Sequence, residues 1–348
     1  MFESKTVFII GAGASNDLDF PLGAEFRDKI AGFLAPIAQG NLRTPAHQIV
    51  SDALRRKSEQ DGDGDNGFAY RKALSEIVSH IGLVRSVDEF INHHAGNRHI
   101  ETVAKVAICW LILQAEAGSE LLLDEEYSQL LNISKLRLKD AWLLELLNLM
   151  RAGSHVSNPR APFRNLSFIV FNYDRCLEVF FTRALVQLFG ASEAEARKIV
   201  DEVPIIHPYG RVGRPDDTDA DFGGFEQITS EKLLQLASGI RTFGESERDQ
   251  EKMATIRALI ENAVNLVFIG FAFHDQNLDF FESQRERLGC WPQTFATAVG
   301  LPAVHQDDIR TALMQKMNLP GASTSFNPQF LTAKGAELLR LYDKPLRR

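Results

Sequence analysis

A short apolar run that ends in two glycines constrains the fold of this chain more than any other feature. Residues Thr6–Ile10 (TVFII) are rich in β-branched and aromatic side chains, which is typical of a parallel strand buried on both faces. Gly11, Ala12 and Gly13 follow directly. Two glycines here allow a tight turn and let a phosphate approach the main-chain N–H groups without a β-carbon in the way. A helix that begins near Ala24 would add the partial positive charge of its N-terminus.

Two common nucleotide-binding fingerprints are absent. No Gly-x-x-x-x-Gly-Lys-Ser/Thr segment occurs, which excludes an ordinary P-loop ATPase. Asn16 stands where the third glycine of Gly-x-Gly-x-x-Gly belongs, so the usual dehydrogenase fingerprint fails as well. What remains is Gly-Ala-Gly-x-Ser, which ends at Ser15 and is followed by a short loop that contains Pro21.

Length and composition predict an intracellular protein. The chain has 348 residues, 45% of them hydrophobic, which is enough for one large domain or two ordinary ones. A net charge of −8 argues against a nucleic-acid-coating protein, so we expect contact with nucleic acid only through a partner. Cys109, Cys176 and Cys290 form no Cys-x-x-Cys pair and predict a reduced protein without a zinc ribbon. Neither a secretion signal nor a run long enough to span a membrane is evident, so we expect a cytoplasmic location.

Strand-like and helix-like segments alternate over much of the chain. After the first strand, we expect strands at 166–171, 203–206, 264–269 and 295–299. The helices that we expect between and after them include 175–189, 250–263, 276–288 and 329–342. This alternation predicts an α/β fold with a doubly wound, mostly parallel Rossmann-like sheet.

The stretch from residue 41 to residue 160 differs from the rest because it shows no convincing strand. Apolar side chains recur there at three- and four-residue spacing, which predicts helices at 46–58, 69–83, 100–117 and 135–151. We therefore expect a core of residues 1–40 and 161–348 that carries a large helical insertion or subdomain, residues 41–160. The acidic segment 58–67 between two of these helices predicts a surface loop.

Polar residues follow two more of the predicted strands, at the place where ligands bind to such sheets. Asn172 and Asp174 alternate after 166–171, so both side chains leave the same side of the strand end. Asp174 also stands where a helix N-cap belongs, and this leaves open whether it is catalytic or a cap. A buried Asn172 would need hydrogen-bond partners. His207 follows 203–206 and is either a structural histidine or a candidate acid/base.

In this order, Gly-Ala-Gly-x-Ser, the Asn-x-Asp of residues 172–174 and the strand-end His207 resemble the sirtuin-like NAD-binding family. The segment from Gly270 to Asp275 (GFAFHD) is similar to a later strand end of that family, which lies by the ribose or adenine of the nucleotide. The resemblance covers the two α/β portions of the chain and leaves the helical stretch unmatched.

The resemblance implies a role for each matched residue. Asn172 would orient the nicotinamide ribose or the attacking water, Asp174 would order that part of the site, and His207 would contact the ribose hydroxyls as general base. NAD would be the substrate, and no metal is expected. The residues that would bind NAD are Gly11, Ala12, Gly13, Ser15, Pro21, Gly270 and Asp275.

Two departures from the family pattern decide which branch the chain resembles. Deacylating sirtuins carry a four-cysteine zinc module, which three scattered cysteines cannot build. His207 is also followed by Pro208 rather than by glycine. Both features argue against protein deacylation. The chain is more similar to bacterial antiphage-defence effectors, which hydrolyse NAD to nicotinamide and ADP-ribose.

Unrestrained NAD hydrolysis would poison the cell, so we expect a regulated enzyme. Control would come from homo-oligomerisation or from a separately encoded partner, and family analogy suggests a HerA-type translocase ATPase. Two other functions stay open. One is a metal-dependent nucleotide or DNA hydrolase that uses His93, His94 and His99 with Asp88 or Glu89. The other is a non-catalytic sensor of NAD or ADP-ribose.

Overall fold

The computed structural model describes residues 1–63, 67–119, 121, 140–155, 157–213, 228–283, 291–319 and 326–347. Within them, six strands form one sheet in the order β3-β2-β1-β4-β5-β6, and all neighbouring pairs are parallel. This is the strand order of the Rossmann doubly wound fold, so the predicted fold class is confirmed. The strands are β1 (Thr6–Ile10), β2 (Leu166–Val170), β3 (Ile205–Ile206), β4 (Asn265–Ile269), β5 (Gln293–Thr297) and β6 (Gln329–Leu331).

The first strand lies at the centre of the sheet. All five of its residues are buried, and Phe8 pairs in register with Phe168 on one side and Val267 on the other. The Phe8 and Phe168 rings stack with their centroids 5.5 Å apart. Strand order reverses between β1 and β4, and in doubly wound sheets a ligand crevice opens at the carboxyl ends of the two strands that flank this point.

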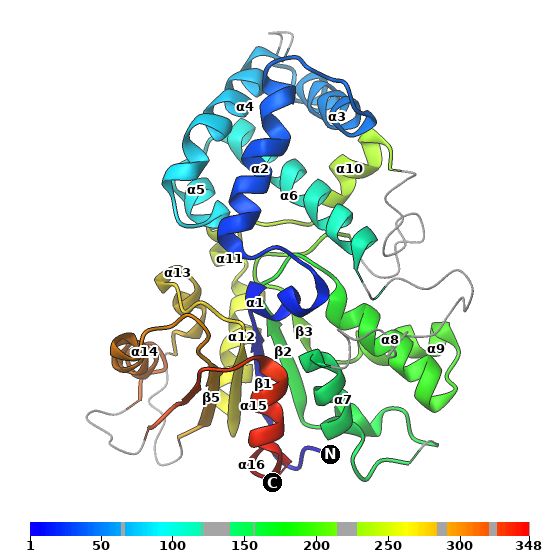
Figure 1. Ribbon diagram of the computed structural model, residues 1–348, viewed down its shortest axis with the longest axis vertical. Helices are drawn as coiled ribbons and strands as arrows, with labels where there is room; N and C mark the ends of the chain where they lie inside the picture. Colours follow the sequence, from blue (N-terminus) through cyan, green and yellow to red (C-terminus); the bar gives the residue numbers. More distant parts are fainter. Residues whose placement is uncertain are drawn as a thin grey trace.

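A group of helices lies beyond the carboxyl ends of the strands (Figure 1). We call this group the helical layer. It consists of α2 (Gly23–Ala38), α3 (Pro45–Asp61), α4 (Phe68–His80), α5 (Val87–His93), α6 (Arg98–Gly118) and α10 (Ser230–Ala237). The short helix α1 (Ala12–Ser15) directly follows β1 and lies between the sheet and this layer (Figure 1).

The helices of the helical layer are not the same residues as the helical insertion 41–160 that the sequence suggests. The layer takes in α2, which precedes residue 41, and α10, which comes from the second half of the chain and packs on α3 and α6. In contrast, α7 (Trp142–Arg151) packs against α15 (Gly335–Leu341) beside the sheet. Trp142 Nε1 donates to the Ala14 carbonyl at 2.9 Å, which ties α7 to the turn after β1.

The remaining described helices do not belong to the helical layer. They are α8 (Cys176–Phe189), α9 (Glu193–Asp201), α11 (Phe243–Arg248), α12 (Gln250–Asn262), α13 (Asp275–Leu278), α14 (Ala303–Lys316) and α16 (Asp343–Arg347). Cys109 and Cys176 are buried free thiols, and Cys290 lies outside the described residues. Among the described helices, none is both long and apolar enough to cross a membrane.

Three predicted elements need correction. The predicted helix 329–342 is wrong at its start, because residues 329–331 pair with β5 as an edge strand and the helix begins only at Gly335. The predicted strand 203–206 is reduced to two residues. The predicted helix 276–288 gives only α13 and a 3₁₀ turn, Asp279–Phe281, and residues 284–290 lie outside the described part. Short apolar segments fit either state locally, so pairing with a neighbouring strand decides between them.

Candidate functional site

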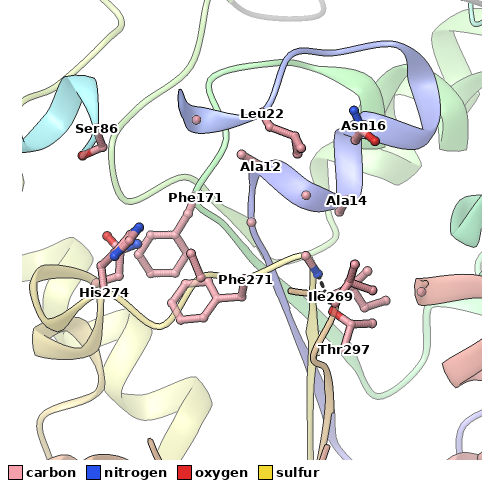
Figure 2. A pocket seen from close by; sticks show the side chains of 18 of the residues that line it. Ala12, Ala14, Asn16, Leu22, Ser86, Phe171, Ile269, Phe271, His274 and Thr297 are labelled. Atoms are coloured by element: carbon pink, nitrogen blue, oxygen red, sulfur yellow. Dashed lines mark hydrogen bonds between the residues drawn. The ribbon is translucent and has the colours of Figure 1, made fainter. Parts of the chain in front are cut away.

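A cavity of about 530 Å³ opens at the point where strand order reverses (Figure 2). Its floor comes from the turns after β1 and β4, and Thr297 at the end of β5 adds to it. His274 and Ser86 lie on one side, and Ile269 and Thr297 lie on the other (Figure 2). A volume in this range is typical of sites for small molecules and cofactors. The charged residues on its wall are Asp17, Arg85, Asp88 and Lys334, with His274 as a titratable neighbour.

Gly11 and Gly13, in the turn after β1, have no room for side chains because this turn contacts the turn after β4. A β-carbon at Gly11 would lie 2.5 Å from the Gly270 carbonyl oxygen, and one at Gly13 would lie 2.9 Å from the Gly270 α-carbon. Gly270 itself has φ = +61°, a conformation that favours glycine. The three glycines therefore let the turns after β1 and β4 meet backbone to backbone under the cavity.

This contact also uses the N–H groups that a phosphate was expected to meet. Gly11 N donates to the Ile269 carbonyl and Gly13 N to the Gly270 carbonyl, both at 3.0 Å. The start of α2 offers a replacement, because the first N–H groups of a helix have no intrahelical acceptor. Leu22, the N-cap, has no side-chain oxygen to accept from them, and Leu22 and Gly23 both line the cavity. An anion in this cavity would therefore meet the positive end of a 16-residue helix.

Beside the first cavity, Asn172, Ser15 and Asp174 form a buried hydrogen-bond chain. Asn172 Nδ2 donates to Ser15 Oγ at 2.8 Å and to the Gly11 carbonyl at 3.1 Å. Ser15 Oγ donates in turn to Asp174 Oδ2 at 2.8 Å. The other Asp174 oxygen accepts from Cys176 N at 3.1 Å, in the first turn of α8. The N-cap of α8 is Arg175 and not Asp174, which the sequence suggested, but Asp174 still binds the N–H of the first helical residue. Asp174 therefore combines a contact at the start of α8 with a contact in the site.

The amide of Asn172 keeps one acceptor without a partner. Its side chain is 6% exposed, and Oδ1 has no hydrogen bond from the described residues. The Gly11 carbonyl fixes the orientation of the amide, because a flipped amide would place Oδ1 against that oxygen. An unsatisfied buried acceptor costs about 1–3 kcal/mol, and such atoms in native proteins often serve a ligand or water.

Asn172 lies on the wall of a smaller chamber of about 90 Å³, which adjoins the first cavity. We call it the Asn172 chamber. Ser15, Pro21 and Asp174 line it as well. The two spaces share five wall residues, namely Ala12, Gly23, Ser86, Asp88 and Phe171. Together they form an elongated space that ends at Asn172.

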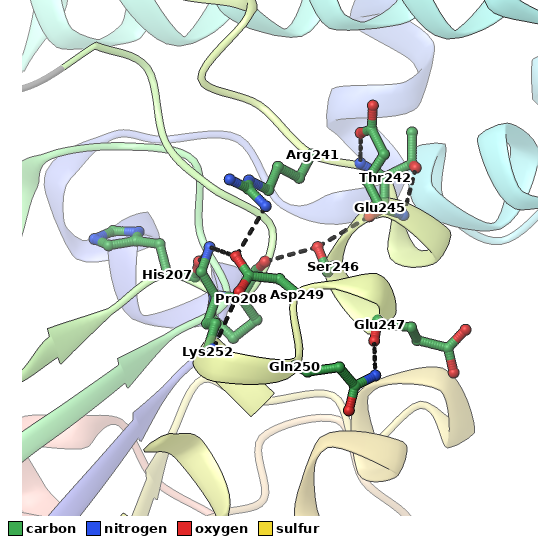
Figure 3. Close-up of polar contacts among 10 residues, drawn as sticks. All are labelled: His207, Pro208, Arg241, Thr242, Glu245, Ser246, Glu247, Asp249, Gln250 and Lys252. Carbon is green, nitrogen blue, oxygen red and sulfur yellow. Dashed lines mark hydrogen bonds and ion pairs between the residues drawn. The ribbon is translucent and has the colours of Figure 1, made fainter. Parts of the chain in front are cut away.

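His207 lies behind this chamber and not on the described wall of either space. Its Nδ1 lies 2.9 Å from the Asn172 carbonyl oxygen and its Nε2 lies 3.0 Å from Glu178 Oε1. Its own carbonyl accepts from Lys252 Nζ at 3.3 Å, on the side away from the ring (Figure 3). Burial lowers the pKa of the ring. This placement supports a role in positioning Asn172 and gives no support to the expected role as general base.

Of the remaining residues expected to bind the ligand, two line the described spaces and one does not. Gly270 lies in the floor of the first cavity and Pro21 lies in the Asn172 chamber. Asp275 is exposed at the start of α13, away from the described walls of both spaces. Its neighbour His274 lines the first cavity instead.

The sequence reasoning did not place Asp88 in this site. Asp88 lies on the walls of both spaces, and the Tyr173 hydroxyl donates to its Oδ1. We expected Asp88 only as a metal companion of the histidines in the insertion. No clear pattern in the sequence marks Asp88 as a site residue. Helix α5 is far from the strand ends in the sequence and lies near them only because of tertiary packing.

Two histidines of the insertion have different acidic neighbours. His94 Nε2 lies 3.6 Å from Glu76 Oε1, and His99 Nε2 lies 3.2 Å from Asp63 Oδ2. Among the described residues, no group of three His, Cys, Asp or Glu side chains is arranged to hold a metal ion. The rival metal-dependent hydrolase therefore gains no support from their geometry.

The fold and the site define a class: a doubly wound α/β protein with a ligand-sized cavity at its topological switch point. Comparison of the chain with protein-family models, curated proteins and solved structures found no match.

Proposed function

We propose that this protein is a regulated NAD glycohydrolase that cleaves NAD to nicotinamide and ADP-ribose. The observation that carries the proposal is the unpartnered Oδ1 of Asn172, buried in a chamber that adjoins the cavity at the switch point. A hydroxyl of the nicotinamide ribose, or the attacking water, has the hydrogen-bond donor that this oxygen lacks. The resemblance to sirtuin-like proteins assigns the same role to Asn172.

The two spaces offer a place for each part of the dinucleotide. The diphosphate would lie at the start of α2, where unpaired N–H groups and the helix dipole favour an anion. Arg85, which also lines the larger cavity, adds positive charge, while Lys334 is paired with Asp17. The exposed side chains of Leu22 and Val299 give the larger cavity apolar surface for the adenine. The nicotinamide riboside would then reach toward Asn172.

The chemistry needs positioning more than a strong nucleophile. Loss of nicotinamide leaves an oxocarbenium-like ribosyl group, and the protein can assist by holding water and charge in place. The chain from Asn172 through Ser15 to Asp174 is suited to this because all three side chains are at least 94% buried. His207 would support it from behind through the Asn172 carbonyl.

Regulation is part of the proposal. The Asn172 chamber, at about 90 Å³, is far smaller than the several hundred Å³ typical of a ligand site, so the reacting end of NAD needs a rearranged wall. Homo-oligomerisation or a separately encoded partner, for which a HerA-type translocase ATPase is our candidate, would favour the open arrangement. Such an enzyme would deplete NAD during phage infection. Its place of action would be the cytoplasm.

The proposal is tested by incubating the purified protein with NAD and separating nicotinamide and ADP-ribose by chromatography. The assay is run at low and high protein concentration, with and without the product of the neighbouring gene, and beside Asn172→Ala. We expect stoichiometric release of both products and no release by the variant. Tight NAD binding without turnover under every condition would instead indicate a sensor. Turnover that persists in Asn172→Ala would reject the site.

A further inference from the structure

One carboxylate belongs to the described walls of both spaces. Asp88 is the second residue of α5 and lines the larger cavity as well as the Asn172 chamber. Ser86, the N-cap of α5, accepts from Glu89 N at 3.1 Å, which fixes the first turn of the helix. Asp88 is therefore held at the junction through which an elongated ligand would pass.

A phenol fixes the orientation of this carboxylate. The Tyr173 hydroxyl donates to Asp88 Oδ1, and Tyr173 is buried directly after Asn172. The contact joins the helical layer to the end of β2. Because Tyr173 directly follows Asn172, its hydrogen bond to Asp88 also fixes the position of Asp88 relative to Asn172. Tyr173 is the described side chain that hydrogen-bonds to Asp88, and it contacts Oδ1; a backbone N–H also acts on this carboxylate. Among the described side chains, none donates a hydrogen bond to Oδ2.

The other carboxylates near the reacting end, and His207, are engaged. Both carboxylate oxygens of Asp174 accept hydrogen bonds, from Ser15 Oγ and from Cys176 N. Asp17, on the wall of the larger cavity, pairs with Lys334 Nζ at 2.9 Å. His207 has both ring nitrogens facing protein acceptors and lies off both walls. Within the described residues, Asp88 is thus the carboxylate that is best placed to receive a proton from a ligand or water.

We propose that Asp88 is the general base of NAD hydrolysis, an inference that rests on the function proposed above. In the reaction, the C1′–N bond to nicotinamide breaks and its electron pair stays on the ring nitrogen, which neutralises the pyridinium. A water oxygen bonds to C1′. The proton that this water loses passes to the Asp88 carboxylate and then to solvent, while Asn172 Oδ1 accepts the other water hydrogen.

The surroundings of Asp88 suit this task. The titratable and charged groups around it are Tyr173 and Tyr209 after β2 and β3, His274 after β4, and Arg85 before α5. Burial raises the pKa of Asp88, and the Tyr173 hydrogen bond and the His274 charge act in the opposite direction. A carboxylate with a raised pKa is a better base near neutral pH. It must be ionised to act, so the rate should fall as the pH falls through that pKa.

The test compares wild type with Asp88→Asn, which keeps an oxygen to accept from Tyr173. Asp52→Asn, an exposed site on α3, makes the same chemical change away from both spaces and serves as the control. Each protein is assayed for kcat across pH under the conditions in which wild type is active. Binding of carba-NAD, whose cyclopentane ring prevents cleavage, is measured by calorimetry. We expect Asp88→Asn to lose about 100-fold or more in kcat, with carba-NAD affinity within about 3-fold and no acid limb in the pH profile.

Each other outcome has a separate meaning. If wild type releases no nicotinamide under any condition, the hydrolase function fails and the role of Asp88 fails with it. If wild type is active and Asp88→Asn stays within about 3-fold of it, only the role of Asp88 is overturned. A variant that loses carba-NAD binding in proportion to its kcat would show that Asp88 binds the ligand and is not the base.

Discussion

Gly270 and Ala14 are in backbone contact: a β-carbon on Gly270 would lie 2.0 Å from the Ala14 nitrogen. The contact joins the turn after β4 to the turn after β1, at the two strands that flank the reversal of strand order. The floor of the larger cavity therefore consists of two loops in direct contact, with glycines where side chains would separate them.

The first prediction concerns this contact. Gly270→Ala should destabilise the protein by at least about 2 kcal/mol, because the new methyl group meets backbone and the φ of +61° is strained for alanine. Gly32→Ala, inside α2 with open space around it, is the control and should stabilise by about 0.5–1 kcal/mol. Urea unfolding of both variants measures the difference. Equal stability of the two would contradict the packing described for the loops.

The second prediction concerns Asn172. Asn172→Ala should abolish NAD turnover if the proposed function holds, and it should also lower the free energy of unfolding by about 1–3 kcal/mol. The physical reason is that the Gly11 carbonyl and Ser15 Oγ each lose a buried donor. Nicotinamide release and thermal unfolding are measured on the same preparation. Full activity in a folded variant would argue against the site.

The third prediction separates the two contacts of Asp174. Asp174→Asn keeps an oxygen for Cys176 N, so the start of α8 should stay intact, with a stability change within about 1 kcal/mol. Its amide nitrogen would, however, face Ser15 Oγ, which already accepts from Asn172. We expect turnover to fall by about 10-fold or more in this variant. Unchanged turnover would mean that the only role of Asp174 is at the start of α8.

The fourth prediction is a pH effect on stability that needs no substrate. Burial raises the pKa of Asp88 above its usual 3.8, so its contribution to stability is present at low pH and is lost as pH rises through the raised pKa. Asp88→Asn does not ionise. Its stability relative to wild type should therefore increase as the pH rises from 3.8 through the raised pKa, by about 1.4 kcal/mol for each unit of the shift. Denaturant unfolding at several pH values measures it. A constant difference across this range would contradict the prediction.

The fifth prediction concerns a buried ion pair that joins the helical layer to α8. Arg175 and Glu116 are 1% and 0% exposed, and Arg175 Nε donates to Glu116 Oε1 at 3.0 Å. Glu116→Gln should cost about 3–5 kcal/mol, because it leaves the buried guanidinium without its counter-charge. The double variant Glu116→Met/Arg175→Met should recover most of this loss, because Met at both positions removes both buried charges. The cycle also includes the two single variants, Glu116→Met and Arg175→Met. A double-mutant cycle in urea measures the coupling, and simple additivity would contradict it.

Local patterns were enough for the fold class and for the first elements of the site. The run Thr6–Ile10 and its glycine turn predicted a central parallel strand, because a strand buried on both faces has no polar alternation. Alternating strands and helices predicted the doubly wound sheet. Asn172 and Asp174 were found for a similar reason, since a strand end next to a helix places polar side chains at the ligand edge of the sheet. These are properties of short segments.

What only the tertiary structure decided depends on contacts between segments that are far apart in the sequence. Asp88 joins the site because the helical layer packs over the strand ends, and no local pattern encodes that packing. His207 lies off the walls of the larger cavity and of the Asn172 chamber because Glu178 and the Asn172 carbonyl hold its ring. Gly11 and Gly13 look like a phosphate loop in the sequence, yet their N–H groups are used by the chain around Gly270. A residue's type limits the chemistry it can perform, but its partners in space determine which of its hydrogen bonds remain for a ligand.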